Sequence, residues 1–437
     1  MTKCSTKKIE FPRCQRRQVE AEFSGGDVTS DGGVMLLRER DRRLGLTQAI
    51  DQVLPDPRNP DLLEHSQLSM LRQRIYGLCL GYEDLNDQQT LRDDPAWQTA
   101  VDRDQTLVSP STLCRLENRF DRDSAIGLHE LLVDQFIASF KRPSKHLVLD
   151  FDATDDRVHG TQEHRFYHGY YKHYCCLPLY VFCGEQLLVS YLRPSNADGA
   201  KHSWAILALL VKKLRQHWPE VKITLRADGG FCRWRMLRWC ENHQVDYIVG
   251  IAGNVRLKSQ AQARIDETEK QYQQTGDKVR LFADLQYQAK SWDRARRVIA
   301  RIEHTDKGSN PRFVITNIKG QAKRLCEQVY CQRGEMENRI KEQQLDLFAD
   351  RTSCHYWWPN QLRLLLASFA YVLMEAIRRL ALKGTDLARA QVGTIRLKLL
   401  KIGAVIIRNT RRVRLLLSSA YPYQVLFFRV VAKLQPG

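Results

Sequence analysis

The sequence lacks the cysteine spacing of a zinc ribbon or of a disulfide framework. Its 12 cysteines are scattered over 437 residues, and no two of them form a Cys-x-x-Cys pair. Unpaired thiols are typical of proteins that stay in a reducing compartment. We therefore expect a cytoplasmic protein whose cysteines are free.

Long hydrophobic runs are missing as well. The longest run, near residues 364 to 377, is too short and too often interrupted to span a bilayer. The N-terminus is polar and basic, without the apolar segment of a signal peptide. The sequence also has no internal repeat and no low-complexity tract. These absences predict a globular protein with no membrane partner.

Positive charge, in contrast, is abundant. Lys and Arg total 68 against 50 Asp and Glu, so the formal net charge is +18. Hydrophobic residues make up 43% of the chain, enough for a large core in two or three domains. A charge excess of this size favours a polyanionic partner, most simply nucleic acid. The alternative is a basic protein that binds no polyanion.

The N-terminal region, residues 1–140, is predicted to be all-helical and to bind DNA. Residues 1–25 are expected to be a flexible basic arm. A helix that begins near residue 110 would present Thr112, Arg115 and Asn118 on one face, as a recognition helix does in a major groove. An ordinary capped helix explains the same pattern equally well.

The pattern changes after residue 145, where short apolar runs alternate with amphipathic stretches. This alternation predicts an α/β architecture with a sheet flanked by helices. It is interrupted between residues 253 and 318, where a polar stretch and three strand-like runs predict a β-rich insertion. The core would then comprise residues 145–252 and 319–385, followed by a basic C-terminal region at 386–437.

Two of the predicted strands end in aspartates that have no obvious structural task. Residues 146–152 form an apolar run that ends in Asp150 and Asp152, and residues 222–228 form another that ends in Asp228. Open α/β sheets keep their sites at such strand ends. A strand-end aspartate is also common as a turn or cap residue, so each position alone is weak evidence.

A third acid comes from a helix predicted to begin near residue 322. At roughly 100° per residue, Tyr330, Arg333 and Glu337 project from one side of this helix, and Lys341 returns to the same stripe. An Arg four residues before a Glu can be a plain surface ion pair. The two strand-end aspartates upstream, Asp152 and Asp228, make a plain surface ion pair a less complete explanation of this stripe.

If the fold brings Asp152, Asp228 and Glu337 together, their charges repel unless a cation lies among them. Carboxylate oxygens without cysteine partners select Mg²⁺ or Mn²⁺. Two such ions can hold the attacking and leaving oxygens of a phosphoryl transfer. The stripe residues would then bind DNA: Arg333 and Lys341 through phosphates, and Tyr330 through a phosphate or a base.

These motifs resemble those of the DDE transposases of bacterial insertion sequences. The third acidic motif of one group is Tyr, two residues, Arg, three residues and Glu, and Tyr330, Arg333 and Glu337 have that spacing. The first motif, an Asp followed closely by Thr, corresponds to residues 152–154. The second, an Asp before Gly and an aromatic residue, corresponds to residues 228–231.

The resemblance covers most of the chain, from about residue 36 to residue 427. It implies an RNase H-like mixed sheet, a β-rich insertion between the second and third acids, and cut-and-paste transposition of DNA with divalent metal. Asp152, Asp228 and Glu337 would be the catalytic and metal-binding residues. Asp150 competes with Asp152 for the first position, but Thr154 follows Asp152 at the distance typical of the family.

One position departs from the family pattern. Related enzymes often carry a Lys seven residues after the Glu, where this chain has Gln344. Lys341 lies on the same predicted stripe, so the residue that takes over this phosphate contact is left open.

The resemblance predicts a bacterial, nucleoid-associated enzyme that binds terminal inverted repeats and target DNA. Because two element ends must be cut in concert, we expect a homodimer in a synaptic complex. Two alternatives stay open: a metal-dependent DNA nuclease of the same fold, and an inactive DNA-binding repressor.

Overall fold

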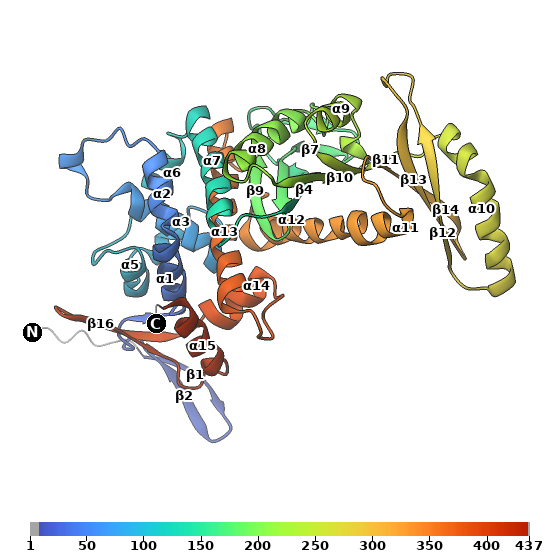
Figure 1. Cartoon of the computed structure of the whole chain (residues 1–437). Helices are drawn as coiled ribbons and strands as arrows, with labels where there is room; N and C mark the ends of the chain where they lie inside the picture. Colours follow the sequence, from blue (N-terminus) through green and yellow to red (C-terminus); the bar gives the residue numbers. More distant parts are fainter. Residues whose placement is uncertain (1–7, 436–437) are drawn as a thin grey trace, which may run out of the picture. The chain divides into compact units, whose positions relative to one another are not determined.

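Figure 1 shows the computed structural model of the chain, which describes residues 8–435. It divides into two compact units: residues 120–368 form one, and residues 1–119 with 369–437 form the other. Helix α13, Trp357–Ala381, contributes to both, because the division falls within it. The roles predicted for the regions of the chain stay predictions.

The unit of residues 120–368 is built on one mixed sheet of eight strands. Their order across the sheet is β12-β13-β14-β11-β10-β4-β8-β9. The strands span β4 His146–Ala153, β8 Leu179–Cys183, β9 Gln186–Tyr191, β10 Lys222–Ala227, β11 Asp246–Ile251, β12 Val279–Tyr287, β13 Arg296–Thr305 and β14 Gly308–Thr316.

Strand direction explains where the sheet keeps its polar residues. β10 runs parallel to both β4 and β11, so the carboxyl ends of these three strands meet at one edge. β8, β9 and β14 are antiparallel to their neighbours. The predicted class, a mixed sheet flanked by helices, is confirmed.

Helices cover both faces of this sheet (Figure 1). α7 (Arg122–Ala138), α8 (Ser203–His217) and α9 (Trp234–Asn242) bury apolar side chains against one face, in a single core with β4, β10 and β11. α12 (Gly334–Leu347) contacts β4 and lies on the opposite side of the sheet from α8 and α9. The helix that carries Glu337 therefore runs beneath the strand that carries Asp152.

The predicted insertion contains three strands and one long helix. β12, β13 and β14 form an antiparallel meander that continues the main sheet through the pairing of β14 with β11. The polar stretch before them, for which the sequence predicted no element, is helix α10, Val255–Thr275. Asn254 caps it by accepting a hydrogen bond from the Leu257 amide, and Leu257 and Ala261 bury one narrow stripe. Figure 1 shows α10 beside these strands.

A small three-stranded sheet follows β4 directly. Its order is β5-β7-β6, with β5 Asp156–Arg157, β6 Phe166–His168 and β7 His173–Cys176. His173 and Asp155 form a hydrogen bond of 2.6 Å, which ties this sheet to the segment just after Asp152.

The second unit joins the two ends of the chain. Its N-terminal part contains helices α1 Val34–Leu44, α2 Leu46–Val53, α3 Gln67–Leu80, α4 Gln88–Leu91, α5 Pro95–Ala100 and α6 Pro110–Glu117, with a 3₁₀ turn at Pro60–Leu62. Its C-terminal part contains α14 Val392–Ile395, a π-helical turn at Arg396–Leu400, β15 Ala404–Asn409, β16 Arg412–Leu417 and α15 Gln424–Leu434. β15 lies between β16 and β3 (Val28–Thr29), so both chain ends share one sheet.

The N-terminal region is helical apart from its first strands. A hairpin of β1 (Ile9–Cys14) and β2 (Arg17–Ala21) takes the place of the expected flexible arm, while residues 1–7 of that arm lie outside the described residues. Ser109 caps α6, on which Arg115 is exposed; Asn118, the residue that follows the helix, is exposed as well. Between residues 8 and 435, no helix has the length and apolar character needed to cross a membrane.

Candidate active site

The two aspartates of β4 differ sharply in their surroundings. Asp150 is bound by Arg226 of β10, whose Nη2 lies 2.7 Å from Asp150 Oδ2 and whose Nε donates to Oδ1. Both side chains are almost fully buried. Asp152 projects from the same side of the strand, and its Oδ2 accepts a hydrogen bond of 3.1 Å from Arg333. Asp150 is thus fixed in the sheet, whereas Asp152 faces the helix with the third motif.

Asp228 lies directly after β10, where Gly229 and Gly230 end the strand. Its Oδ1 accepts a hydrogen bond of 2.9 Å from the amide of Gly230. This is the ordinary turn-cap role of a strand-end aspartate. The remaining carboxylate oxygen is left for other partners, and the charge of Asp228 acts on Asp152, Tyr330 and Arg333.

The helix predicted for the third motif is present but irregular. It begins as α11 (Ala322–Arg324), widens into a π-helical turn at Leu325–Tyr330, tightens into a 3₁₀ turn at Cys331–Arg333 and continues as α12. π-Helical turns inside helices occur frequently at functional sites. Here the irregular turns lie at Tyr330 and Arg333, immediately before Glu337.

Arg333 joins two of the predicted acids. Its Nη1 donates to Asp152 Oδ2 at 3.1 Å, and its Nη2 donates to Glu337 Oε1 at 2.5 Å. Asp152 and Glu337 are 185 positions apart in the sequence, and a single guanidinium holds both. The predicted ion pair of Arg333 with Glu337 is therefore part of a larger cluster.

Burial dominates the ionisation of Asp152. Burial, with smaller contributions from the charges of Asp228 and Glu337, raises the pKa of this carboxyl to about 7, although the charge of Arg333 opposes the rise. The charges of Asp228 and Glu337 thus both disfavour the ionised form of Asp152. Such repulsion is the electrostatic signature of a site that accepts a cation.

Tyr330 lies close to the turn after β10. Gly250 on β11 leaves room for it: a Cβ there would lie 2.7 Å from the Tyr330 hydroxyl and 2.8 Å from the amide nitrogen of Gly229. Burial raises the pKa of the Tyr330 phenol, and the charge of Arg333 opposes that rise. The phenol is thus set beside both Asp228 and Arg333.

A cavity of about 250 Å³ opens beside Tyr330, Arg333 and Glu337. Its other wall contains Arg301 of β13 and Arg312 of β14. No sequence motif marks these two arginines, because only the pairing of the two strands brings them together. The alternation of side chains along each strand was the available signal.

Lys341 of the stripe and Gln344, three residues further along α12, differ in their contacts. Lys341 is exposed and makes no ion pair or hydrogen bond to any residue between 8 and 435. Gln344, at the position where related enzymes often carry Lys, donates hydrogen bonds to the Asp155 carbonyl at 3.2 Å and to Asp156 Oδ1 at 3.1 Å. Gln344 therefore anchors α12 to the start of the small sheet.

A family model described as Transposase DDE domain group 1 matches residues 11–437. The chain belongs to this family of DDE transposases. The predicted family is thereby confirmed. The chain is also similar to the cryo-EM structure of a piggyBac transposase synaptic complex with hairpin DNA. That match has 12% identity and a TM-score of 0.41, and it covers 84% of this chain and 79% of that chain. Comparison with curated proteins gives no match.

Divalent metal is the general cofactor of DDE transposases, and the acids of this transposase suit it by chemistry. All three are carboxylates, and the charges of Asp228 and Glu337 both act on Asp152. Over residues 8–435, no three acidic, histidine or cysteine side chains are arranged as a ligand set. Instead, the guanidinium of Arg333 provides the positive charge between Asp152 and Glu337.

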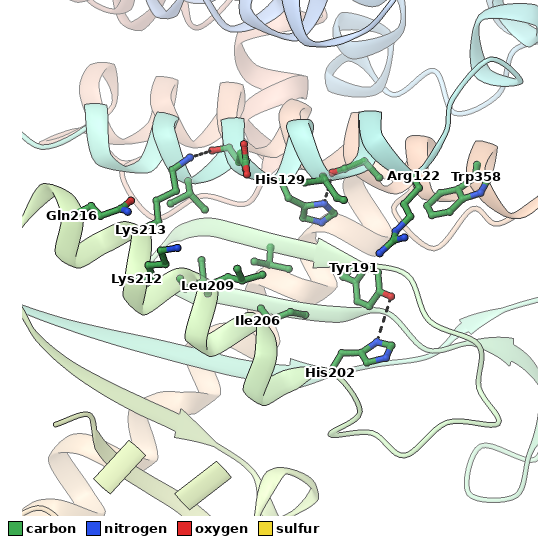
Figure 2. A pocket seen from close by; sticks show the side chains of 16 residues that line it. Arg122, His129, Tyr191, His202, Ile206, Leu209, Lys212, Lys213, Gln216 and Trp358 are labelled. Carbon is green, nitrogen blue, oxygen red and sulfur yellow. Dashed lines mark hydrogen bonds between the residues drawn. The ribbon is translucent and has the colours of Figure 1, made fainter. Parts of the chain in front are cut away.

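A larger cavity of the transposase, about 540 Å³, lies between α7, α8 and β9 (Figure 2). Its walls are mostly apolar, and none of the three predicted acids lines it. His129 reaches both the Ala125 carbonyl, at 2.7 Å, and the Ser190 carbonyl, at 3.0 Å, and burial lowers its pKa. Figure 2 shows this imidazole between α7 and the strand below it. The cavity is open to solvent, since Ile126 and Leu209 in its wall are exposed.

Proposed function

We propose that this DNA transposase cleaves DNA at the ends of an insertion sequence and joins the freed ends to target DNA. The hypothesis assigns catalysis and metal binding to Asp152, Asp228 and Glu337. Arg333, Lys341 and Tyr330 would bind the phosphates of the DNA. The core would be RNase H-like, which the antiparallel β8 and β9 and the parallel β4, β10 and β11 support.

One observation carries the proposal: Arg333 contacts Asp152 and Glu337 at the same time. Two acids of the family pattern, one on a strand and one on a helix, thus meet at one point of the fold. Asp228 is near enough that its charge raises the pKa of Asp152. Separate structural roles for these acids would not require them to converge.

The side chains would divide the work as follows. Asp152, Asp228 and Glu337 would hold two divalent ions, Mg²⁺ or Mn²⁺. When bound, such ions supply positive charge to the attacking and leaving oxygens of the phosphoryl group. Arg333 would turn from the carboxylates to a phosphate of the bound strand, a ligand that its forked guanidinium fits. Tyr330 would donate a hydrogen bond from its phenolic hydroxyl to a neighbouring phosphate oxygen.

The proposed reaction requires DNA and a second copy of the protein as partners. Double-stranded DNA would be bound through terminal inverted repeats and as the target, with help from the N-terminal helices and the net charge of +18. A homodimer would hold two element ends in one synaptic complex. The protein would act in the bacterial cytoplasm, at the nucleoid.

The test is a Mg²⁺-dependent cleavage and joining assay on a plasmid that carries the two ends of the source element. We expect the wild type to cut and join, and Glu337→Gln to do neither while it still binds DNA. Glu335→Gln is the matched control, because Glu335 lies on the same helix, is exposed and is not among the lining residues of the site cavity. Loss of activity in both variants would contradict the assignment of Glu337.

The same assay separates the two alternatives. Cutting without joining, even with precut ends, would identify a nuclease. Salt-sensitive binding without cutting by the wild type would identify a DNA-binding repressor.

A further inference from the structure

Two arginines lie directly opposite each other on the inserted strands. In the antiparallel pairing of β13 with β14, Arg301 is the register partner of Arg312. Directly opposed residues of such a pair project from the same face, with Cβ atoms about 4.5–5.5 Å apart. The meander thus places two permanent positive charges side by side.

Like charges in this arrangement destabilise a sheet. Little in the surroundings offsets them. Arg301 Nη2 lies 3.3 Å from Glu303, but Glu303 is shared with Arg280 at 2.7 Å and with Lys278 at 3.3 Å. Arg312 is exposed and has no ion-pair partner within the part of the chain that the structure describes. The repulsion between the two guanidinium groups is therefore not offset by ion pairs within the described part of the chain.

The face on which the pair lies is turned toward the candidate active site. On the same face, Ile299 and Val314 pack against Leu325 and Cys326 of the π-helical turn. Arg301 Nη1 lies 3.2 Å from the sulfur of Cys331, next to Tyr330 in the chain. Both arginines line the cavity of about 250 Å³ that Tyr330, Arg333 and Glu337 also line.

We propose that Arg301 and Arg312 together bind a phosphodiester group of the DNA strand that enters the candidate active site. This inference rests on the proposed function, since it names a contact of the same DNA. An anion between two guanidinium groups removes their repulsion and can accept hydrogen bonds from both. The inserted meander would then form one wall of the DNA site, opposite Arg333.

The opposite face of the same sheet provides a matched control. α10 packs there through Leu257 and Ala261, in one core with Val298 and Ala300. Arg256, in the first turn of α10, is exposed and belongs to the same inserted segment. Arg256→Gln therefore removes one charge from the insertion without touching the cavity.

The experiment measures binding of an uncut duplex that carries the end of the source element, over a range of salt concentrations. Each lost phosphate contact makes the slope of log K against log salt less steep by about 0.9. Because the two arginines share one phosphodiester group, we expect the double variant Arg301→Gln with Arg312→Gln to show this full change, and Arg256→Gln to keep the wild-type slope. Arg312→Lys keeps the charge and should retain most of the slope.

A second measurement shows that the variants fold and tests the repulsion. Thermal unfolding without added anion should give Arg312→Gln a melting temperature equal to or above that of the wild type. Inorganic phosphate should raise the melting temperature of the wild type more than that of Arg312→Gln. A variant that unfolds earlier than the wild type would show that the pair stabilises the fold by itself, against the proposal.

A wild-type salt slope in the double variant Arg301→Gln with Arg312→Gln would overturn the assignment, as would an equal change in Arg256→Gln. The assay measures binding of uncut DNA and does not require the protein to cleave it. A wild-type protein that binds DNA but never cuts it would contradict the proposed function. The proposed contact of Arg301 and Arg312 with a phosphodiester group would not be contradicted by that result.

Discussion

Arg226 on β10 binds both carboxylate oxygens of Asp150 on β4, across two parallel strands whose register aligns these residues. The same guanidinium also donates a hydrogen bond of 2.5 Å to the Val329 carbonyl, just before Tyr330. Arg226 therefore connects the two central strands to the helix of the third motif. Because Asp150 is held by this contact, Asp152 is the acid of β4 that faces Arg333 and Glu337.

Asp150→Asn should therefore act on stability. Removing one partner of a buried ion pair leaves the other charge unpaired, which costs about 3–5 kcal/mol. Asp152→Asn should lower the free energy of unfolding little or not at all, because burial already raises the pKa of Asp152 to about 7. It should abolish cleavage. Urea denaturation and the plasmid assay, applied to both variants, measure the two effects.

The contrast between these variants decides which aspartate is the first acid. Activity that survives in Asp152→Asn but vanishes in a stably folded Asp150→Asn would reverse our assignment. A double variant, Asp150→Leu with Arg226→Met, removes both buried charges and should recover much of the stability.

Gly250→Ala should disturb the site without removing any functional group. The added Cβ would lie 2.7 Å from the Tyr330 hydroxyl and 2.8 Å from the Gly229 amide nitrogen, so at least one of them must shift. Overpacking of this kind costs about 1–3 kcal/mol. We expect a lower free energy of unfolding and slower cleavage than in the wild type.

Tyr330→Phe distinguishes the clash of the added Cβ with the Tyr330 hydroxyl from its clash with the Gly229 amide nitrogen. It removes the hydroxyl but leaves the backbone amide of Gly229 in place, so in the Gly250→Ala background it should recover only part of the stability. Full recovery would show that the hydroxyl alone is crowded. Chemical denaturation of the four proteins of this double-mutant cycle gives the answer.

Stability should depend on pH through Asp156, a fully buried carboxyl four residues after Asp152. Burial raises the pKa of Asp156 well above its ordinary value, although Gln344 donates a hydrogen bond to it. As pH rises above about 4, the unfolded chain releases this proton while the folded chain keeps it. The unfolded state then binds fewer protons, so the free energy of unfolding falls with rising pH.

Asp156→Asn cannot titrate and keeps an oxygen for the amide of Gln344. Its free energy of unfolding, relative to the wild type, should therefore increase steadily as pH is raised above about 4. Urea denaturation at several pH values provides the comparison, in which the contributions of all other acids cancel. A difference that is constant with pH, or that shrinks as pH rises, would contradict this account.

The parts of the site that were predictable are those with a local pattern. An apolar run ending in Asp marked β4 and β10, and regular helical spacing placed Arg333 and Glu337 on one stripe. Strand register is not a local pattern: neither the contact of Arg226 with Asp150 nor the pairing of Arg301 with Arg312 can be read from spacing alone. Helix α10 was missed because so few of its residues are buried.

Arg333→Lys tests whether the fork of the guanidinium matters. Arg333 holds Asp152 with Nη1 and Glu337 with Nη2, whereas the single ammonium of Lys cannot reproduce this two-nitrogen geometry. We expect the variant to fold and to lose cleavage by about 10- to 100-fold, since a misplaced positioning group costs on this order. Arg339→Lys is the control, because Arg339 lies on the same helix and joins Glu185 and Glu342 in a similar way. A rate for Arg333→Lys equal to that of Arg339→Lys would show that the positive charge at this position suffices, and the geometry of the fork would carry no function.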